Sequence, residues 1–566
     1  PVIITSTLAR GAISMSKHKV IVKELGTIQS FGEMDILCTD KTGTLTEDKI
    51  VVEKYMNVHG DDDYRVLRHA FLNSYFQTGL KNLIDHAIIK RGNSKSFSSL
   101  LEQYYRVDEI PFDFSRRRMS VVLQDEAGKR QLITKGAVEE MIEISSFVEV
   151  NGKVIPLDEI SKQIALETYE KYNNDGLRII AVAQKNEVPG VDVFSIKDES
   201  EMVLIGFIGF LDPPKESSKS AIIALKDHGV RTIVLTGDSG GVTKKVCNKV
   251  GISTAEMISG LEVEAFSDNQ LKESLQTCDI YYKLSPSQKE RIVSVLQADG
   301  HTVGFMGDGI NDAQALRQAD IGISVDSAVD IAKETADIIL LEKDLMVLEE
   351  GVLEGRKTFG NINKYLKMAL SGNFGNIISV VIASLFLPFY PIIPVQLLTQ
   401  NLLNDFSQIG IPFDKVDSSY IRKPRKWDPK SIMRFMFVMG PISTIFDILC
   451  FGILWWIVGA NTKDLSPLFQ SGWFVFGTIS QILVIYVIRT ARVPFLQSRP
   501  SKQLFISTLS VAIIAIIISF SNFAISIDMM RLPITFLFWL IALSFAYILT
   551  VQWVKHIYIK RFKEWL

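Results

Sequence analysis

The sequence has little of several features that mark common classes of protein. Its 566 residues include four cysteines, which lie far apart without a CxxC pair, so neither a disulfide framework nor a structural zinc site is indicated. The formal net charge is only -2, which gives no overall positive field of the kind that attracts nucleic acid. The chain also has no GxxxxGK[ST] motif, which excludes a Walker-type phosphate loop.

Long apolar runs occur only in the second part of the chain, after about residue 365. Earlier apolar runs are short and alternate with charged stretches, whereas later ones are long and separated by brief polar loops. Lys and Arg gather in alternate loops and in the tail, which predicts that these segments and the large polar region are cytoplasmic. The expected spans are 366–387, 391–411, 435–458, 472–490, 504–527 and 534–554.

The polar region contains three short apolar runs that each end in an aspartate: Asp40, Asp238 and Asp308. An alternation of strands and helices with this pattern predicts a doubly wound parallel sheet, which binds ligands at the carboxyl ends of its strands. The segment between the first two runs is too long for a crossover connection. We therefore expect an inserted domain at about 50–211.

The heptapeptide Asp-Lys-Thr-Gly-Thr-Leu-Thr at 40–46 places the Asp40 carboxylate at the exposed end of a strand. Gly43 allows the backbone to wrap around a phosphoryl group. A carboxylate in this position can attack the γ-phosphate of ATP and form an acyl phosphate. An aspartate that caps a turn is the default interpretation of an isolated Asp-Lys pair, but the complete heptapeptide favours the nucleophile.

A transferring phosphoryl group needs positive charge and hydrogen-bond donors around its oxygens. Lys289 can supply an ammonium group, and Thr236 and Asn311 can supply hydrogen bonds. Because Mg²⁺ prefers oxygen ligands, we expect it to be held by Asp40, Asp308 and the carbonyl of Thr42, with Asp312 in support.

Three motifs, in this order, resemble the signatures of P-type ATPases: 40–46, Thr236-Gly237-Asp238, and Gly-Asp-Gly-Ile-Asn-Asp at 307–312. The likeness to magnesium-transporting members extends over essentially the whole chain, including 400–414 and 469–474. It implies a haloacid-dehalogenase-like α/β phosphorylation domain with an inserted α+β nucleotide-binding domain, and an α-helical transmembrane bundle. It also implies ATP and Mg²⁺ as cofactors and import of Mg²⁺ across the plasma membrane.

The resemblance divides the chain into five parts. They are a span end and stalk at 1–31, the phosphorylation domain at 32–49 and 212–350, the nucleotide-binding domain at 50–211, and a stalk with six spans at 351–566. The family also has earlier spans and an actuator domain with a Thr-Gly-Glu loop. We find no such loop here and expect those parts of the pump as a partner.

By position, Arg116, Lys135, Gly136 and Arg178 match nucleotide-binding residues of the family, and Phe114 matches an aromatic residue that stacks on adenine. Phe114 at strand spacing could equally belong to a hydrophobic core. In the family, Gly237 and Asp238 also lie at the phosphate site.

Polar side chains in the first two expected spans form two clusters, each on one side of its helix. A single intramembrane asparagine commonly joins two helices. Five such groups on adjacent spans, with Asp405 as the only carboxylate, instead indicate a cation site. Amide oxygens suit a partly hydrated Mg²⁺. The five residues are Asn373, Asn376, Asn401, Asn404 and Asp405.

Two alternatives stay open at this point. One is a pump for another cation, such as Ca²⁺. The other is a membrane-anchored phosphatase of the haloacid-dehalogenase group. Soluble phosphatases of that group commonly keep a second aspartate two residues after the nucleophile, where this chain has Thr42, and the polar clusters in the spans also disfavour this reading.

Overall fold

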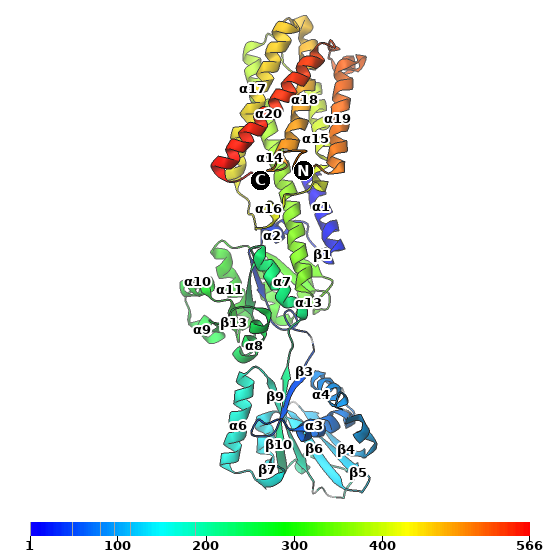
Figure 1. The fold of residues 1–566 in the computed structure, drawn as a ribbon, viewed down its shortest axis with the longest axis vertical. Coiled ribbons are helices and arrows are strands. Elements are labelled where there is room, and N and C mark those ends of the chain that lie inside the picture. The colour runs from blue at the N-terminus through cyan, green and yellow to red at the C-terminus, as the bar shows by residue number, and fades with distance from the viewer. Residues whose placement is uncertain are drawn as a thin grey trace.

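The computed structural model describes residues 2–47, 49–79, 81–95, 97–113, 115–186, 188 and 190–565. Three regions follow one another along the long axis of the molecule: a bundle of long helices, a sheet flanked by helices, and a second sheet at the far end (Figure 1). Helices α1 (Val2–Lys17) and α14 (Leu345–Phe386) run from the bundle toward the first sheet.

The first sheet has eight strands, and every neighbouring pair is parallel except β1 with β16. The central strand β2 is buried along its whole length, as its sequence Ile-Leu-Cys-Thr predicts for a strand covered on both faces. In spatial order the strands are β1 (Val20–Val22), β16 (Ile338–Leu340), β15 (Ile321–Val325), β14 (Val303–Met306), β2 (Ile36–Thr39), β11 (Arg231–Leu235), β13 (Ile280–Tyr282) and β12 (Ile258–Ser259).

Helices pack on this sheet and enclose a hydrophobic core of valine, isoleucine and leucine side chains. They include α2 (Thr27–Glu33), α7 (Glu216–Asp227), α8 (Gly240–Val250), α9 (Gly260–Ala265), α10 (Asp268–Thr277), α11 (Pro286–Ala298), α12 (Ala313–Gln318) and α13 (Asp330–Thr335).

The second sheet lies between β2 and β11 in the sequence, in the segment for which an inserted domain is predicted. It is antiparallel except where β10 pairs with β7. The two connecting segments run side by side, because Thr46 bridges to Pro214. The strands are β4 (Tyr104–Asp113), β5 (Arg118–Asp125), β6 (Arg130–Gly136), β9 (Arg178–Lys185), β10 (Met202–Leu211), β7 (Ser145–Val150) and β8 (Lys153–Pro156), with β3 (Val51–Met56) beside β10.

The helices of this region are α3 (Tyr64–Phe76), α4 (Leu83–Asn93), α5 (Val138–Glu143) and α6 (Glu159–Asn174). Helix α3 contains the buried His69. Its Nδ1 lies 2.7 Å from the carbonyl of Arg65, and Nε2 lies 3.4 Å from Nε2 of Gln131. A neutral ring with its proton on Nδ1 satisfies both contacts. Burial lowers the pKa of His69 to about 4.

We therefore expect this region to lose stability as the pH falls from about 6.5 to about 4, because the unfolded chain binds a proton that the buried ring does not. Over the whole of this pH range, the lowered pKa corresponds to a loss of about 3 kcal/mol in the free energy of unfolding. Hydrogen exchange of the α3 and β6 amides against pH measures the effect. His69→Gln should flatten the profile, and the exposed His59→Gln should leave it unchanged. An equally steep profile in His69→Gln would contradict this assignment.

Five helices in the described part of the chain are long and apolar enough to cross a membrane: Leu345–Phe386, Pro429–Ile457, Lys463–Ile488, Lys502–Phe520 and Phe536–Phe562. They contain α14, α17 (Pro429–Gly452), α18 (Ser466–Ile488), α19 (Lys502–Phe520) and α20 (Phe536–Phe562).

The expected span at 391–411 contains a shorter helix, α15 (Pro394–Gln408), of 15 residues. A spanning helix needs about 20 residues. Pro394 occupies the first turn, and Gly410 and Pro412 follow the last, so the local sequence limits the length of the helix. Five of the six predicted spans thus correspond to helices of sufficient length, and α15 packs beside α18 and α19.

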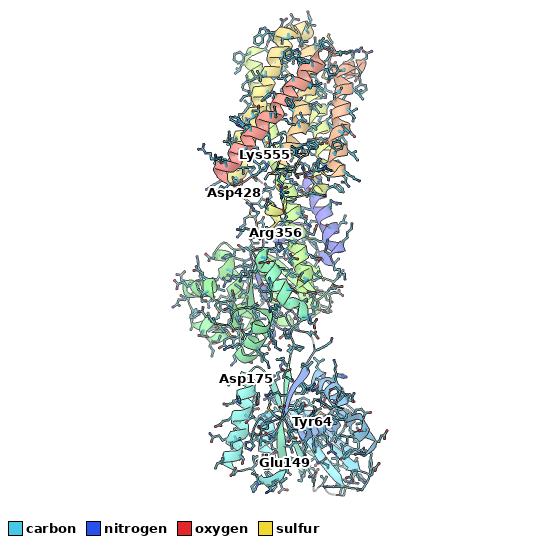
Figure 2. The ribbon with its side chains drawn as sticks, in the orientation of Figure 1. Tyr64, Glu149, Asp175, Arg356, Asp428 and Lys555 are labelled. Carbon is cyan, nitrogen blue, oxygen red and sulfur yellow. The ribbon has the colours of Figure 1, made fainter. Side chains whose placement is uncertain are left out.

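Arg356 joins the helical bundle to the first sheet. This side chain of α14 is buried at the narrow part of the molecule (Figure 2). Its guanidinium donates to the carbonyls of Gly32 at 3.2 Å, His228 at 2.8 Å and Ile421 at 3.0 Å. One side chain therefore ties α14 to α2, to the turn before β11 and to α16 (Ser418–Ile421).

A second buried polar cluster holds the loops at the same end of the bundle. Oδ2 of Asp414 lies 2.9 Å from both Nζ of Lys364 and Nε of Arg489. Lys364 also donates to the carbonyl of Lys415, and Arg489 to that of Ser498. The cluster fixes the loops after α15 and α18 against α14.

Candidate functional site

Asp40 lies immediately after β2, between β14 and β11. Its Oδ1 accepts a hydrogen bond from the backbone N–H of Lys41 at 2.7 Å, and its Oδ2 lies 3.3 Å from Nζ of Lys289. Gly43 has φ of 72°, the left-handed conformation that turns the chain away after the carboxylate. Asp40 thus stands at the carboxyl end of the central strand with one cation beside it.

Lys289 is positioned by α11, which begins with a capping box between Ser285 and Gln288. Its ammonium also lies 2.8 Å from Oδ1 of the buried Asp312. Burial acts to lower the pKa of Lys289, but the carboxylates of Asp40 and Asp312 outweigh it and raise the pKa above its ordinary value. Burial raises the pKa of Asp40 to about 6, against the attraction of Lys289. Lys289 is therefore a fixed positive charge at the carboxylate.

Gly307 explains how Asp312 comes so close to the strand end. A Cβ at this position would meet the Asp312 side chain at 2.6 Å. The Asp312 carboxylate also accepts from the backbone N–H of Gly309 at 3.2 Å. Asn311, the other polar residue of this turn, is exposed.

Asp238 follows β11 and contacts residues of the heptapeptide, so the second motif packs against the first. Its Oδ2 lies 2.7 Å from Nζ of the buried Lys41 and accepts from Oγ1 of Thr42 at 2.8 Å. Its backbone N–H donates to Oγ1 of Thr236 at 3.2 Å, with Gly237 between them in the turn. Burial acts to raise the pKa of Asp238, but the charge of Lys41 prevails and lowers it. The structure thus brings together both motifs, which are far apart in the sequence.

Asp308 follows β14, the neighbour of β2, so it lies at the same edge of the sheet as Asp40. Its Oδ2 accepts from Nζ of Lys343 at 2.7 Å, so an ammonium group pairs with this carboxylate. The donor set of two carboxylates and the Thr42 carbonyl fits Mg²⁺. Among the described residues no group of three or more His, Cys, Asp or Glu side chains is arranged to hold a metal ion. Water and phosphate oxygens would have to complete the coordination.

The second sheet holds the expected nucleotide-binding residues, and internal carboxylates neutralise two of them. Arg116 donates to the buried Glu199 at 2.6 Å, and Lys135 forms a buried ion pair with Asp85. Burial lowers the pKa of Lys135 despite the charge of Asp85. Phe114 lies outside the described residues. The structure therefore places Arg116 and Lys135 in contacts that also serve the fold.

Arg178 and Gly136 have more specific positions. Arg178 begins β9, and its Nη2 lies 3.9 Å from Oδ1 of Asp238, so it connects the second sheet to the strand-end edge of the first that contains Asp40. At Gly136 a Cβ would meet the carbonyl oxygen of Arg117 at 2.8 Å, so glycine permits the close approach of β6 to the turn before β5.

A cavity of about 260 Å³ lies in the helical bundle between α14, α15 and α18. Four of the five predicted ion-site residues line it, and Asn376 does not. Asn404 Oδ1 and Gln408 Oε1 are buried and accept no hydrogen bond within the described part of the protein. Amide oxygens without a donor are available to a cation. The lining includes Asn373, Asn401, Asn404, Asp405, Gln408 and Gln481.

Comparison with known proteins identifies the family. The family model described as P-type ATPase, cytoplasmic domain N, matches residues 63–217, and the model described as cation transporting ATPase, C-terminus, matches residues 389–557. The chain belongs to the P-type ATPases. The family prediction is confirmed. The mixed sheets and the five long apolar helices are consistent with the predicted phosphorylation and nucleotide-binding domains and the membrane bundle.

Similar P-type ATPases with curated names include magnesium transporters. The chain is 52% identical over 562 residues to "Magnesium-transporting ATPase, P-type 1" of Escherichia coli (strain K12), covering 99% of this chain and 63% of the relative. It is 50% identical to the protein of that name in Salmonella typhimurium (strain 14028s / SGSC 2262), covering 99% and 62%. A calcium-transporting ATPase of Listeria monocytogenes is 32% identical over 447 residues, covering 75% and 51%. The chain thus spans less than two thirds of the length of these relatives.

The sequence did not single out two features of this P-type ATPase. Gln408 lies four residues after Asn404, so helical spacing could have revealed it. Asp447 in α17 is a fully buried carboxylate inside an apolar span, and an isolated acidic residue in such a span is itself a signal.

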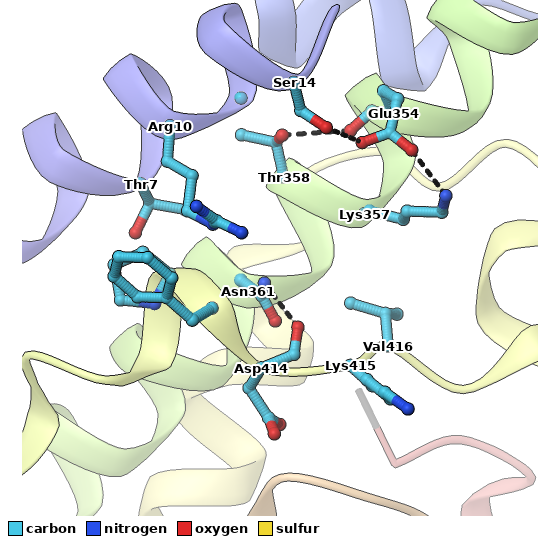
Figure 3. A pocket seen from close by; sticks show the side chains of 13 residues that line it. Thr7, Arg10, Ser14, Glu354, Lys357, Thr358, Asn361, Asp414, Lys415 and Val416 are labelled. Carbon is cyan, nitrogen blue, oxygen red and sulfur yellow. Dashed lines mark hydrogen bonds and ion pairs between the residues drawn. The ribbon is translucent and has the colours of Figure 1, made fainter. Parts of the chain in front are cut away.

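A cavity of about 350 Å³ lies where α1, α14 and the loop at 411–416 meet (Figure 3). The Arg10 guanidinium lies 4.0 Å above the ring of Phe413, and Ser14 donates to Glu354 at 2.7 Å. These contacts join α1 to α14 and to the loop after α15.

Proposed function

We propose that this chain is the catalytic and ion-conducting part of a P-type ATPase that imports Mg²⁺ through an aspartyl-phosphate intermediate on Asp40. The observation that carries the proposal is the placement of Lys289 at 3.3 Å from Asp40 and 2.8 Å from Asp312, at the end of β2. A carboxylate nucleophile beside a buried, fixed cation is suited to phosphoryl transfer.

In the proposed reaction an oxygen of Asp40 attacks the γ-phosphorus of ATP, an acyl phosphate forms, and ADP leaves. The Lys289 ammonium and the Thr236 hydroxyl stabilise the phosphoryl oxygens, and Arg178 lies between the two sheets. Asp40, Asp308 and the Thr42 carbonyl would hold Mg²⁺. When bound, this ion neutralises charge on the phosphate oxygens.

Thr42 favours a pump over the alternative of a phosphatase. Its hydroxyl donates to Asp238 at 2.8 Å. A threonine side chain has no carboxyl group that could act as a general acid and base beside Asp40. Slow hydrolysis would let the phosphoenzyme persist while the helices move. This is the behaviour that transport requires.

The bundle cavity supports Mg²⁺ over Ca²⁺. Its lining contains one carboxylate, Asp405, and otherwise amides, a tyrosine hydroxyl and apolar groups. Such a set suits an ion that keeps part of its water. The relatives named as magnesium-transporting also share more of this sequence than the calcium-transporting one does.

We further propose the domain boundaries at 32–49, 50–211 and 212–350, a haloacid-dehalogenase-like phosphorylation domain, and a multi-pass location in the plasma membrane with the sheets in the cytoplasm. The spans and the actuator domain expected from the family would act with this chain in transport.

The test is transport by the complete pump in sealed vesicles. ATP should drive movement of Mg²⁺, reported by a Mg²⁺-sensitive dye on the receiving side, and Ca²⁺ should not be moved. Movement of Ca²⁺ alone would overturn the choice of ion. ATP hydrolysis without a phosphoenzyme and without ion movement would overturn the pump itself.

A further inference from the structure

Asp447 is a buried carboxyl group inside the bundle that the proposed cation site does not use. It lies on α17 between α14 and α18 and is 3% exposed. Oδ1 accepts from Nε1 of Trp473 at 3.0 Å, and Oδ2 lies 2.6 Å from Oγ of Ser379. Both neighbours are uncharged.

The electrostatic surroundings supply no balancing charge within the described residues. On α17 itself the titratable neighbour is Cys450, and on α20 it is Tyr547. Both are ordinarily neutral near pH 7. Ser379 of α14 and Trp473 of α18 complete the surroundings. An isolated carboxylate buried in a bilayer is costly, so such a group either pairs with a cation or carries a proton.

The hydrogen bonds around Ser379 accommodate that proton. Its single hydroxyl hydrogen faces two oxygens, Oδ2 of Asp447 at 2.6 Å and the carbonyl of Gly375 at 3.0 Å. A proton on Oδ2 can be donated to Ser379, whose own hydrogen then goes to Gly375. Oδ1 stays free to accept from Trp473. Every polar atom in this chain of contacts then has a partner.

We propose that Asp447 is a proton-binding site of the membrane bundle, neutral in this conformation. Release breaks the Oδ2–H bond, leaves its electron pair on the carboxylate and passes the proton to water. Ser379 would then turn from Gly375 to Asp447. Ser379, the partner of Asp447, lies on α14 about two turns from Asn373, which lines the bundle cavity. The proposed proton site therefore contacts a helix that also borders that cavity.

Infrared spectroscopy of the full chain in lipid vesicles tests the assignment at neutral pH. A protonated carboxyl group gives a C=O stretching band that a carboxylate lacks. Asp447→Asn should remove one such band completely, and the exposed Asp464→Asn should remove none. An unchanged band in folded Asp447→Asn would overturn the proposal.

Two further variants keep the test decisive if Asp447→Asn does not fold. Ser379→Ala removes the acceptor of the carboxyl hydrogen, and Trp473→Phe removes the donor to Oδ1. Each should shift the band to higher frequency while retaining it, because a C=O bond stiffens when the carboxyl group loses a hydrogen bond. If neither variant moves the band, Asp447 does not carry the proton. The experiment needs no ATP and no transported cation, so its outcome is independent of the proposed function.

Discussion

Replacement of Asp40 by asparagine is expected to abolish phosphorylation of the chain by ATP. The amide has nearly the same size and can still accept from the N–H of Lys41, so the turn should keep its shape. It lacks the anionic oxygen that attacks phosphorus. Loss of a covalent nucleophile commonly lowers rates by several orders of magnitude.

Incorporation of radiolabelled γ-phosphate measures this effect. The label should be acid-stable and hydroxylamine-labile in the parent and undetectable in Asp40→Asn. Asp62→Asn, at an exposed position of the second sheet region, is the matched control and should label normally. The assay is run on this chain and on the complete pump. Label that persists in Asp40→Asn would refute the nucleophile.

Replacement of Asp405 by asparagine should abolish Mg²⁺ transport by the complete pump. Asp405 supplies the only carboxylate among the residues that line the bundle cavity. Asparagine keeps the size and much of the hydrogen bonding, so only the formal charge is lost. A hard divalent cation depends on that charge for binding.

Uptake by cells that need magnesium distinguishes this role from a merely structural one. Gln408→Ala should weaken uptake, because it removes a buried amide oxygen that accepts no hydrogen bond among the described residues. Asp464→Asn, in the short helix Lys463–Leu465 outside the cavity, should behave like the parent when expression is matched. Near-normal uptake by Asp405→Asn would mean that the carboxylate only joins helices.

Local sequence was sufficient to predict which aspartates meet at one edge of the first sheet. Asp40, Asp238 and Asp308 each end an apolar run, and parallel strands bring their carboxyl ends to one edge. The contact of Lys289 with Asp312 follows from the same topology once α11 is placed. These features depend on hydrophobic periodicity, on the spacing of the motifs and on the direction of the strands, all of which can be inferred from a sequence.

Other features depend on pairings between distant segments. Lys135 matches a nucleotide-binding position, yet its ammonium meets Asp85 across α4 and β6. Asp447 finds partners on two other helices. Helix α15 begins and ends at prolines and glycine that hydropathy averages conceal. Burial and partner choice are properties of packing, so no local pattern could supply them.

The 42 residues of α14 form one uninterrupted helix from the base of the first sheet into the bundle. At 1.5 Å per residue it is about 63 Å long, so tilting it by about 5° would carry its far end by about 5 Å. Arg356 lies near the soluble end, and Asn373 lies near the cavity. A small change of helix angle near the proposed phosphorylation site would thereby become, at the far end of the helix, a displacement comparable to the width of a cation with its water.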